Sequence, residues 1–123
     1  MSRQVYIQNQ NHPLERPLTA IYCESFFSRL RGFTFRHHLA LEEGLILVQE
    51  RASRLDASIH MLAVFTDLAV FWLDETGSVV DTVRAKAWRL AYIPKRPAKF
   101  VLEIHPDRAD EFQIGDKVTF TDV

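Results

Sequence analysis

Apolar residues in this chain fall into short runs that are separated by polar segments containing Pro, Gly or Asn. Runs 45–48 and 68–73 are apolar throughout, which indicates strands buried on both faces rather than helices too short to be stable. Segments 79–88 and 99–104 instead place alternate residues on opposite faces, as a half-buried strand does. We predict strands at residues 5–7, 18–23, 45–48, 68–73, 79–88, 99–104 and 117–121.

Two short helices are expected among these strands. Ser25 stands where an N-cap belongs, and apolar residues at helical spacing follow it as far as Gly32. Pro106, followed by acidic residues, is typical of a first helical turn. Segment 74–77 reads as a hairpin turn. Seven or eight strands with one or two small helices predict a mainly β fold, either a β-sandwich or a closed β-roll.

Length and composition limit the class of protein. A chain of 123 residues forms one domain, here residues 1–123, with a core that needs no metal or disulfide. The apolar share of 47% and the charged share of 25% are those of a soluble globular protein. Cys23 is the single cysteine, so no internal disulfide can form. Neither an export signal nor a membrane span is visible, so we expect a cytoplasmic protein.

Charge is distributed unevenly along the chain. Residues 82–102 contain six cations and no acid, although the whole chain has a net charge of −1. Within this segment Arg84, Lys86, Trp88 and Arg89 combine cations with an aromatic ring, a pattern that can hold an anion. We predict a binding surface there, with Arg31 as a further ligand contact, for an anionic small molecule or a protein partner. The alternative is a solvated cationic rim around a Trp88 that plugs the barrel.

An acid/base pair is the main enzymatic alternative. His60 and Asp67 are polar residues inside an otherwise apolar stretch, and a carboxylate beside an imidazole raises its basicity. Arg31 or Arg89 would then stabilise an oxyanion. The structural alternative is that His60 bonds to a backbone carbonyl and Asp67 only begins its strand.

Other chemistry finds little support in the sequence. His37 and His38 are adjacent and no ligand spacing typical of zinc occurs, so we expect neither metal nor cofactor. The four glycines are scattered, which disfavours a phosphate-binding loop. We expect nucleic acid less than a smaller anion as a partner of the basic segment. The acidic segment 103–123 opposes the basic one, which allows a third reading, an oligomerising structural module.

Several short motifs, taken in order, give the chain a family resemblance. They are Arg31-Gly32-Phe33, residues 43–48, Ser58-Ile59-His60, residues 70–74, Ala87-Trp88-Arg89, residues 98–104 and Gly115-Asp116. Over about residues 21–120 the chain resembles the uncharacterised domain of unknown function 192 family. The resemblance implies a small, mostly β fold without an established biochemical role. Members of that family usually carry a carboxylate where this chain has Ala69, and Asp67 lies two residues away on the same predicted strand face.

Overall fold

A computed structural model of the chain describes residues 3–24, 39–59, 61, 66–88 and 91–123. These residues form seven strands and one short 3-10 helix, so the predicted mainly β fold is confirmed. In chain order the elements are β1 (Arg3–Asn9), β2 (Thr19–Cys23), β3 (Glu43–Ser53), β4 (Leu68–Leu73), β5 (Val79–Ala85), β6 (Ala98–Ile104), η1 (Pro106–Glu111) and β7 (Val118–Asp122).

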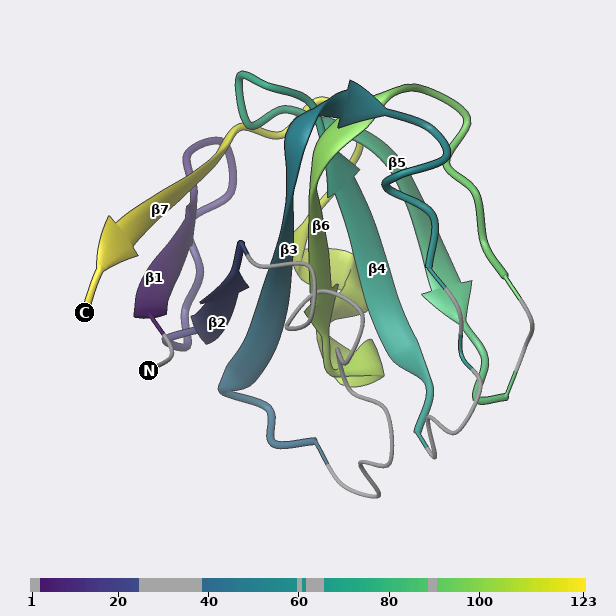
Figure 1. Ribbon diagram of the computed structural model, residues 1–123. Helices are drawn as coiled ribbons and strands as arrows, with labels where there is room; N and C mark the ends of the chain where they lie inside the picture. Colours follow the sequence, from purple (N-terminus) through teal and green to yellow (C-terminus); the bar gives the residue numbers. More distant parts are fainter. Residues whose placement is uncertain (1–2, 25–38, 60, 62–65, 89–90) are drawn as a thin grey trace.

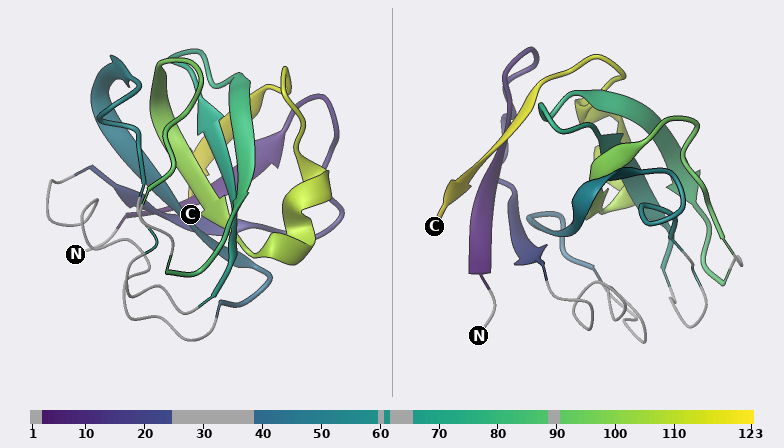
Figure 2. Two further views of the ribbon diagram at one scale, coloured as in Figure 1. Left: turned by 90° about the vertical axis from the view of Figure 1, so that its right-hand side faces the viewer. Right: turned by 45° about the horizontal axis from the view of Figure 1, so that its top comes forward.

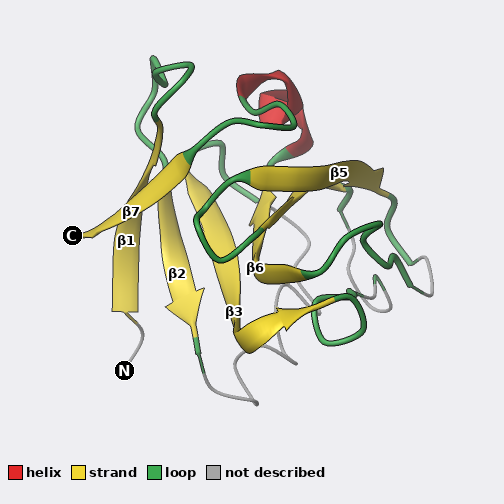
Figure 3. Ribbon diagram, turned by 90° about the horizontal axis from the view of Figure 1, so that it is seen from above, coloured by secondary structure: helices red, strands yellow, loops and turns green. Residues whose placement is uncertain are grey.

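All seven strands form a single mixed sheet in the order β5-β4-β6-β3-β2-β1-β7. Only the β2–β3 pair is parallel. The sheet curves strongly (Figures 1, 2 and 3), and its two edges meet at one end, where Ser78 bridges Lys117 and Val79 N donates to Asp116 O at 2.9 Å. Of the two architectures left open by the sequence, this single curled sheet corresponds to the β-roll.

Gly77 allows the edges of the sheet to come this close. It has a φ of +89°, and a Cβ atom at this position would lie 2.5 Å from the carbonyl oxygen of Val118. The preceding carboxylate of Asp74 accepts hydrogen bonds from the N–H groups of Thr76 and Ser78. The predicted turn at residues 74–77 is therefore present, and it joins β4 to β5 at the point where the roll closes.

Apolar side chains pack on both faces of the sheet. The face enclosed by the roll carries the barrel core, to which all seven strands contribute and which Phe112 covers after η1. The opposite face carries the loop-covered core, where Ala57, Ile59 and Met61 from the β3–β4 connection pack on the sheet. All six residues of β4 are buried, which confirms the prediction of a strand covered on both faces.

One strand differs in detail from its sequence-based prediction, and one of the two predicted helices is present among the described residues. Val79 was expected to share a face with Asp81, but a register shift in the β4–β5 pairing places Val79 in the barrel core. Such a bulge adds one residue to a strand and reverses the side-chain direction beyond it. The short helix predicted after Pro106 is the 3-10 helix η1. The helix predicted between Ser25 and Gly32 lies outside the described residues.

Candidate ligand-binding surface

Two of the predicted cations lie on the solvent-facing side at the end of β5. Arg84 and Lys86 are exposed, whereas Val83 and Ala85 face the loop-covered core. Arg84 has a neighbour of opposite charge, since its Nε lies 3.7 Å from Oδ2 of Asp67. Both side chains of this pair are partly solvated, so the pair adds little to stability and leaves most of the guanidinium accessible.

Trp88 is the most unusual residue of this surface. Its φ of +68° is the one positive value among the described residues other than glycine, and its side chain is 53% exposed. Its N–H donates to Met61 O at 2.7 Å, while the preceding N–H, of Ala87, donates to Oδ1 of Asp67 at 3.0 Å. The prediction that Trp88 continues the face of β5 is wrong, because β5 ends at Ala85 and the chain turns there. Trp88 is also too exposed to plug the roll.

The β5–β6 connection is fixed by hydrogen bonds beyond Trp88. Tyr92 and Ile59 exchange two backbone hydrogen bonds of 2.8 and 2.9 Å, and the Tyr92 hydroxyl accepts from Lys86 N. The buried carboxylate of Asp81 accepts from Lys95 N at 2.8 Å. The backbone that carries the cations is therefore held in place by residues distant in sequence.

Three cations on this connection, Lys86, Lys95 and Arg96, are exposed. Their side chains form no ion pair or hydrogen bond with other described residues. The structure brings Arg84, Lys86 and Trp88 into one region around the end of β5. The other two predicted ligand contacts, Arg31 and Arg89, lie outside the described residues.

Asp67, one half of the predicted acid/base pair, immediately precedes β4. Its carboxylate binds the N–H of Ala87 and lies beside Arg84, so both oxygens have structural partners. This arrangement corresponds to the structural reading, in which Asp67 begins its strand. His60 lies outside the described residues, so its pairing with Asp67 stays a prediction.

Comparisons with known proteins place this geometry in a family. The model of the DUF192 family, described as uncharacterized ACR, matches residues 6–120. The chain belongs to the DUF192 family. It is 35% identical to the UPF0127 protein TK1120 of Thermococcus kodakarensis over 101 residues, which cover 80% of this chain and 62% of the relative. A UPF0127 protein of Pyrococcus abyssi is 31% identical over 98 residues, which cover 78% of this chain and 80% of the relative.

Solved structures support the DUF192 fold at low sequence identity. A candidate transcription regulator from Sinorhizobium meliloti has a TM-score of 0.82 at 14% identity. The match covers 98% of this chain and 94% of the regulator. A protein of unknown function from Novosphingobium aromaticivorans has a TM-score of 0.78 at 19% identity. The match covers 96% of this chain and 84% of that protein. The family is uncharacterised, and this chain spans about three-fifths of the length of the first relative named above.

The resemblance to the family implies a carboxylate at position 69, and this chain has an alanine there. Ala69 is fully buried in the barrel core with Phe71 and Leu102. Asp67 does not replace that carboxylate inside the roll, because it lies before β4 and bonds to the β5–β6 connection. In this member of the family, charged groups in this region therefore lie at the end of β5 and outside the barrel core.

Glu103 is a buried carboxylic acid that the sequence did not single out. It lies on β6 between Leu45 and Val70, is 4% exposed, and forms no hydrogen bond or ion pair within the described residues. Burial among apolar side chains raises the pKa of Glu103 to about 7.

Two further polar clusters were also missed, and both hold loops together. Arg108 is 2% exposed and donates to the carboxylate of Glu111 and to the carbonyls of Arg16, Pro17 and Leu41. It thereby joins η1 to the loops that precede β2 and β3. A sequence offers no signal for this role, because most arginines are exposed.

The second cluster surrounds Asp116, which accepts hydrogen bonds from Asn9 Nδ2, from Gln113 N and from Nδ1 of His12. Burial alone would raise the pKa of Asp116, but these hydrogen bonds outweigh it and hold the pKa below the ordinary value of 3.8. His12 is mostly exposed, so the cluster presents an imidazole oriented by a carboxylate. No nucleophilic side chain is hydrogen-bonded to it among the described residues, so we assign it a structural role.

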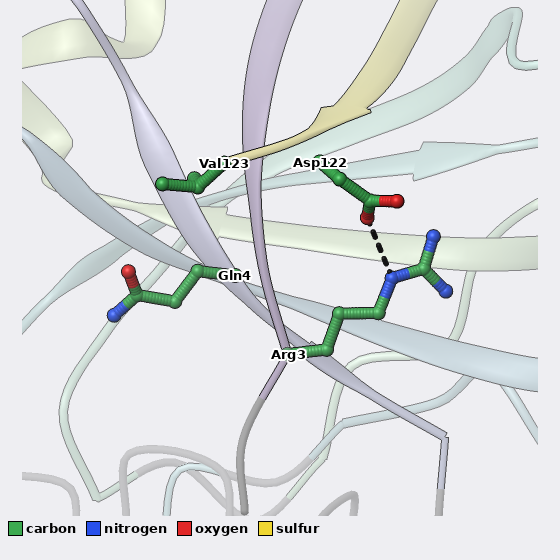
Figure 4. A pocket seen from close by; sticks show the side chains of 4 residues that line it. All are labelled: Arg3, Gln4, Asp122 and Val123. Carbon is green, nitrogen blue, oxygen red and sulfur yellow. Dashed lines mark hydrogen bonds and ion pairs between the residues drawn. The ribbon is translucent and has the colours of Figure 1, made fainter.

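A shallow hollow of about 400 Å³ lies near the chain ends and is lined by Arg3, Gln4, Asp122 and Val123 (Figure 4). Arg3 Nε donates to Asp122 at 2.8 Å, and its guanidinium lies 4.5 Å from the ring centre of Tyr22. Its charge is thus already balanced, and the hollow contains none of the predicted site residues.

No three His, Cys, Asp or Glu side chains among the described residues converge as metal ligands would. No helix in that part of the chain has the length and apolar character needed to cross a membrane.

Proposed function

We propose that this DUF192 protein is a non-enzymatic binding module that holds an anionic partner at the end of β5 and along the β5–β6 connection. The observation that carries the proposal is the conformation of Trp88. A left-handed backbone costs a residue other than glycine roughly 1–2 kcal/mol, and Trp88 adopts it while the residue remains 53% exposed. Strain of this kind is concentrated at functional sites.

The charges around Trp88 support an anionic partner. Lys86, Lys95 and Arg96 are exposed and unpaired among the described residues, and Arg84 is only partly neutralised by Asp67. Cations beside an exposed aromatic ring hold an anion by charge while the ring contacts its apolar part. Because the backbone of this connection is fixed by hydrogen bonds, binding would cost little additional ordering.

The competing enzymatic proposal has less support. A general base must reach its substrate or an imidazole, whereas the contacts that the described residues give Asp67 are with the N–H of Ala87 and the side chain of Arg84. The arrangement therefore favours binding over acid/base catalysis by this residue.

Fluorescence titration with tripolyphosphate at low salt tests the proposal, because Trp88 is exposed whereas Trp72 is buried. We expect saturable binding that weakens at least about tenfold in the variant K86S/R96S. The control R16S/K117S removes one Lys and one Arg elsewhere and should bind like the wild type. Equal affinity in both double variants, or no binding by the wild type, would overturn the proposal.

A further inference from the structure

Exposed apolar side chains lie beside the cations of the proposed binding surface. Leu55 is 74% exposed and Ile93 is 51% exposed. They belong to different connections, Leu55 to the one between β3 and β4 and Ile93 to the one between β5 and β6. Two large aliphatic side chains at these exposures leave apolar surface in water that neither core uses.

Hydrogen bonds bring the two connections together. Nε of Arg54 donates to Pro94 O at 3.0 Å, and Ile59 pairs with Tyr92 in an antiparallel bridge. We call segments 54–59 and 91–97, joined in this way, the loop pair. Leu55 follows Arg54 and Ile93 precedes Pro94, so the first of these hydrogen bonds places the two apolar residues near each other.

The loop pair has a buried side and an exposed side. Ala57 and Ile59 are buried and Tyr92 packs against the same loop-covered core. Side chains alternate in extended segments, and Ile93, the neighbour of Tyr92, accordingly faces solvent. The exposed side is therefore supported from beneath by packed side chains and has a defined shape.

Charge on the loop pair has one dominant sign. Arg54, Lys95 and Arg96 are exposed, and Asp56 is the one acid of the two segments. A partner that covers this surface must supply acidic groups for the cations and apolar side chains for Leu55 and Ile93. Leu55 and Ile93 offer no ring for stacking nucleic-acid bases, so the loop pair, which does not include Trp88, fits an acidic peptide better than a single-stranded nucleic acid.

We infer that the exposed side of the loop pair is a docking site for an acidic peptide segment bearing aliphatic side chains. This inference rests on the proposed function and specifies the class of its anionic partner. The peptide's carboxylates would contact the cations at the ends of the surface, and its apolar side chains would cover Leu55 and Ile93. Such a combination of an apolar centre and a charged rim is the usual anatomy of a protein interface.

Three probes test the inference: a synthetic peptide of Glu and Leu, a matched peptide with Ser in place of Leu, and tripolyphosphate. The variant L55S/I93S changes apolar contacts but not charge, and both positions are exposed, so its stability should stay within about 0.5 kcal/mol of the wild type. We expect it to bind the Glu/Leu peptide at least about tenfold more weakly and tripolyphosphate as before. The control I114S removes an exposed apolar residue elsewhere and should leave both affinities unchanged.

The outcomes separate this inference from the proposed function. If L55S/I93S binds the Glu/Leu peptide as the wild type does, or if the Ser peptide binds equally well, the peptide inference is overturned while anion binding stands. Stronger binding of a single-stranded oligonucleotide than of the Glu/Leu peptide also overturns it. If neither peptide nor tripolyphosphate binds the wild type at low salt, both the inference and the proposed function fail.

Discussion

Ionisation of Glu103 should make this protein less stable as the pH rises through neutrality. The side chain lies between Leu45 and Val70 on the interior strand β6, with no hydrogen-bond donor for a negative charge among the described residues. In the folded chain its pKa is raised from 4.5 to about 7. The folded state therefore holds the proton more tightly than the unfolded state does, and stability falls wherever the unfolded chain has released it.

The size of the effect follows from the two pKa values. Each pKa unit corresponds to about 1.4 kcal/mol, so the change from 4.5 to about 7 makes ionised Glu103 cost the folded state about 3 kcal/mol. The full stability is present below pH 4.5, declines as the pH rises, and is lost above the folded pKa of about 7. For a domain of this size the melting temperature should fall by roughly 10 °C in consequence.

Urea unfolding at pH 5, 7 and 9 measures this effect when the wild type is compared with the E103Q variant. Gln has nearly the same shape but cannot ionise, so E103Q should match the wild type within about 1 kcal/mol at pH 5 and be more stable by about 3 kcal/mol at pH 9. The control E75Q changes an exposed carboxylate in the β4–β5 turn and should follow the wild type. Parallel profiles for wild type and E103Q would refute the reasoning.

Two predictions concern the residues that hold the roll together. R108M should lower the free energy of unfolding by about 3–5 kcal/mol in urea, because it leaves Glu111 and three carbonyls without their buried donor; a loss below about 1 kcal/mol would contradict this role. G77A should be destabilised by about 1–3 kcal/mol, and by more than G115A, since both glycines have positive φ but only at Gly77 would a Cβ atom meet backbone, at 2.5 Å. Equal losses in the two glycine variants would show that contact with Val118 is unimportant.

Local patterns in the sequence were sufficient for the strands but not for the site. The apolar run of β4 and the turn at residues 74–77 depend on neighbours in sequence, and both were predicted correctly. The sheet face predicted for Val79 was wrong because a bulge depends on how β5 pairs with β4, and the sequence of one segment does not reveal that pairing. The left-handed turn at Trp88 likewise depends on Met61 and Asp67, which are distant in sequence.

The sequence analysis also missed Glu103, because its burial cannot be predicted from β6 alone. Glu103 follows Leu102 in an alternating strand, and alternation predicts that a Glu there faces solvent. It is nevertheless only 4% exposed, and the same face of the sheet carries the loop-covered core, on which Ala57, Ile59 and Met61 of the β3–β4 connection pack. Whether such a cover exists depends on how a long connection folds back, and hydrophobic periodicity within β6 contains no information about it.

The β3–β4 and β5–β6 connections couple the interior of this protein to its proposed binding surface. Ile59 and Tyr92 pack inward, whereas Leu55 and Ile93, in the same two segments, face solvent. Substituting an inward residue should therefore change both stability and binding, while substituting an outward one should change binding alone. The loop-covered core depends on these segments, whereas the barrel core is built by the sheet itself with Phe112. A partner bound to the loop pair should therefore stabilise the loop-covered core more than the barrel core.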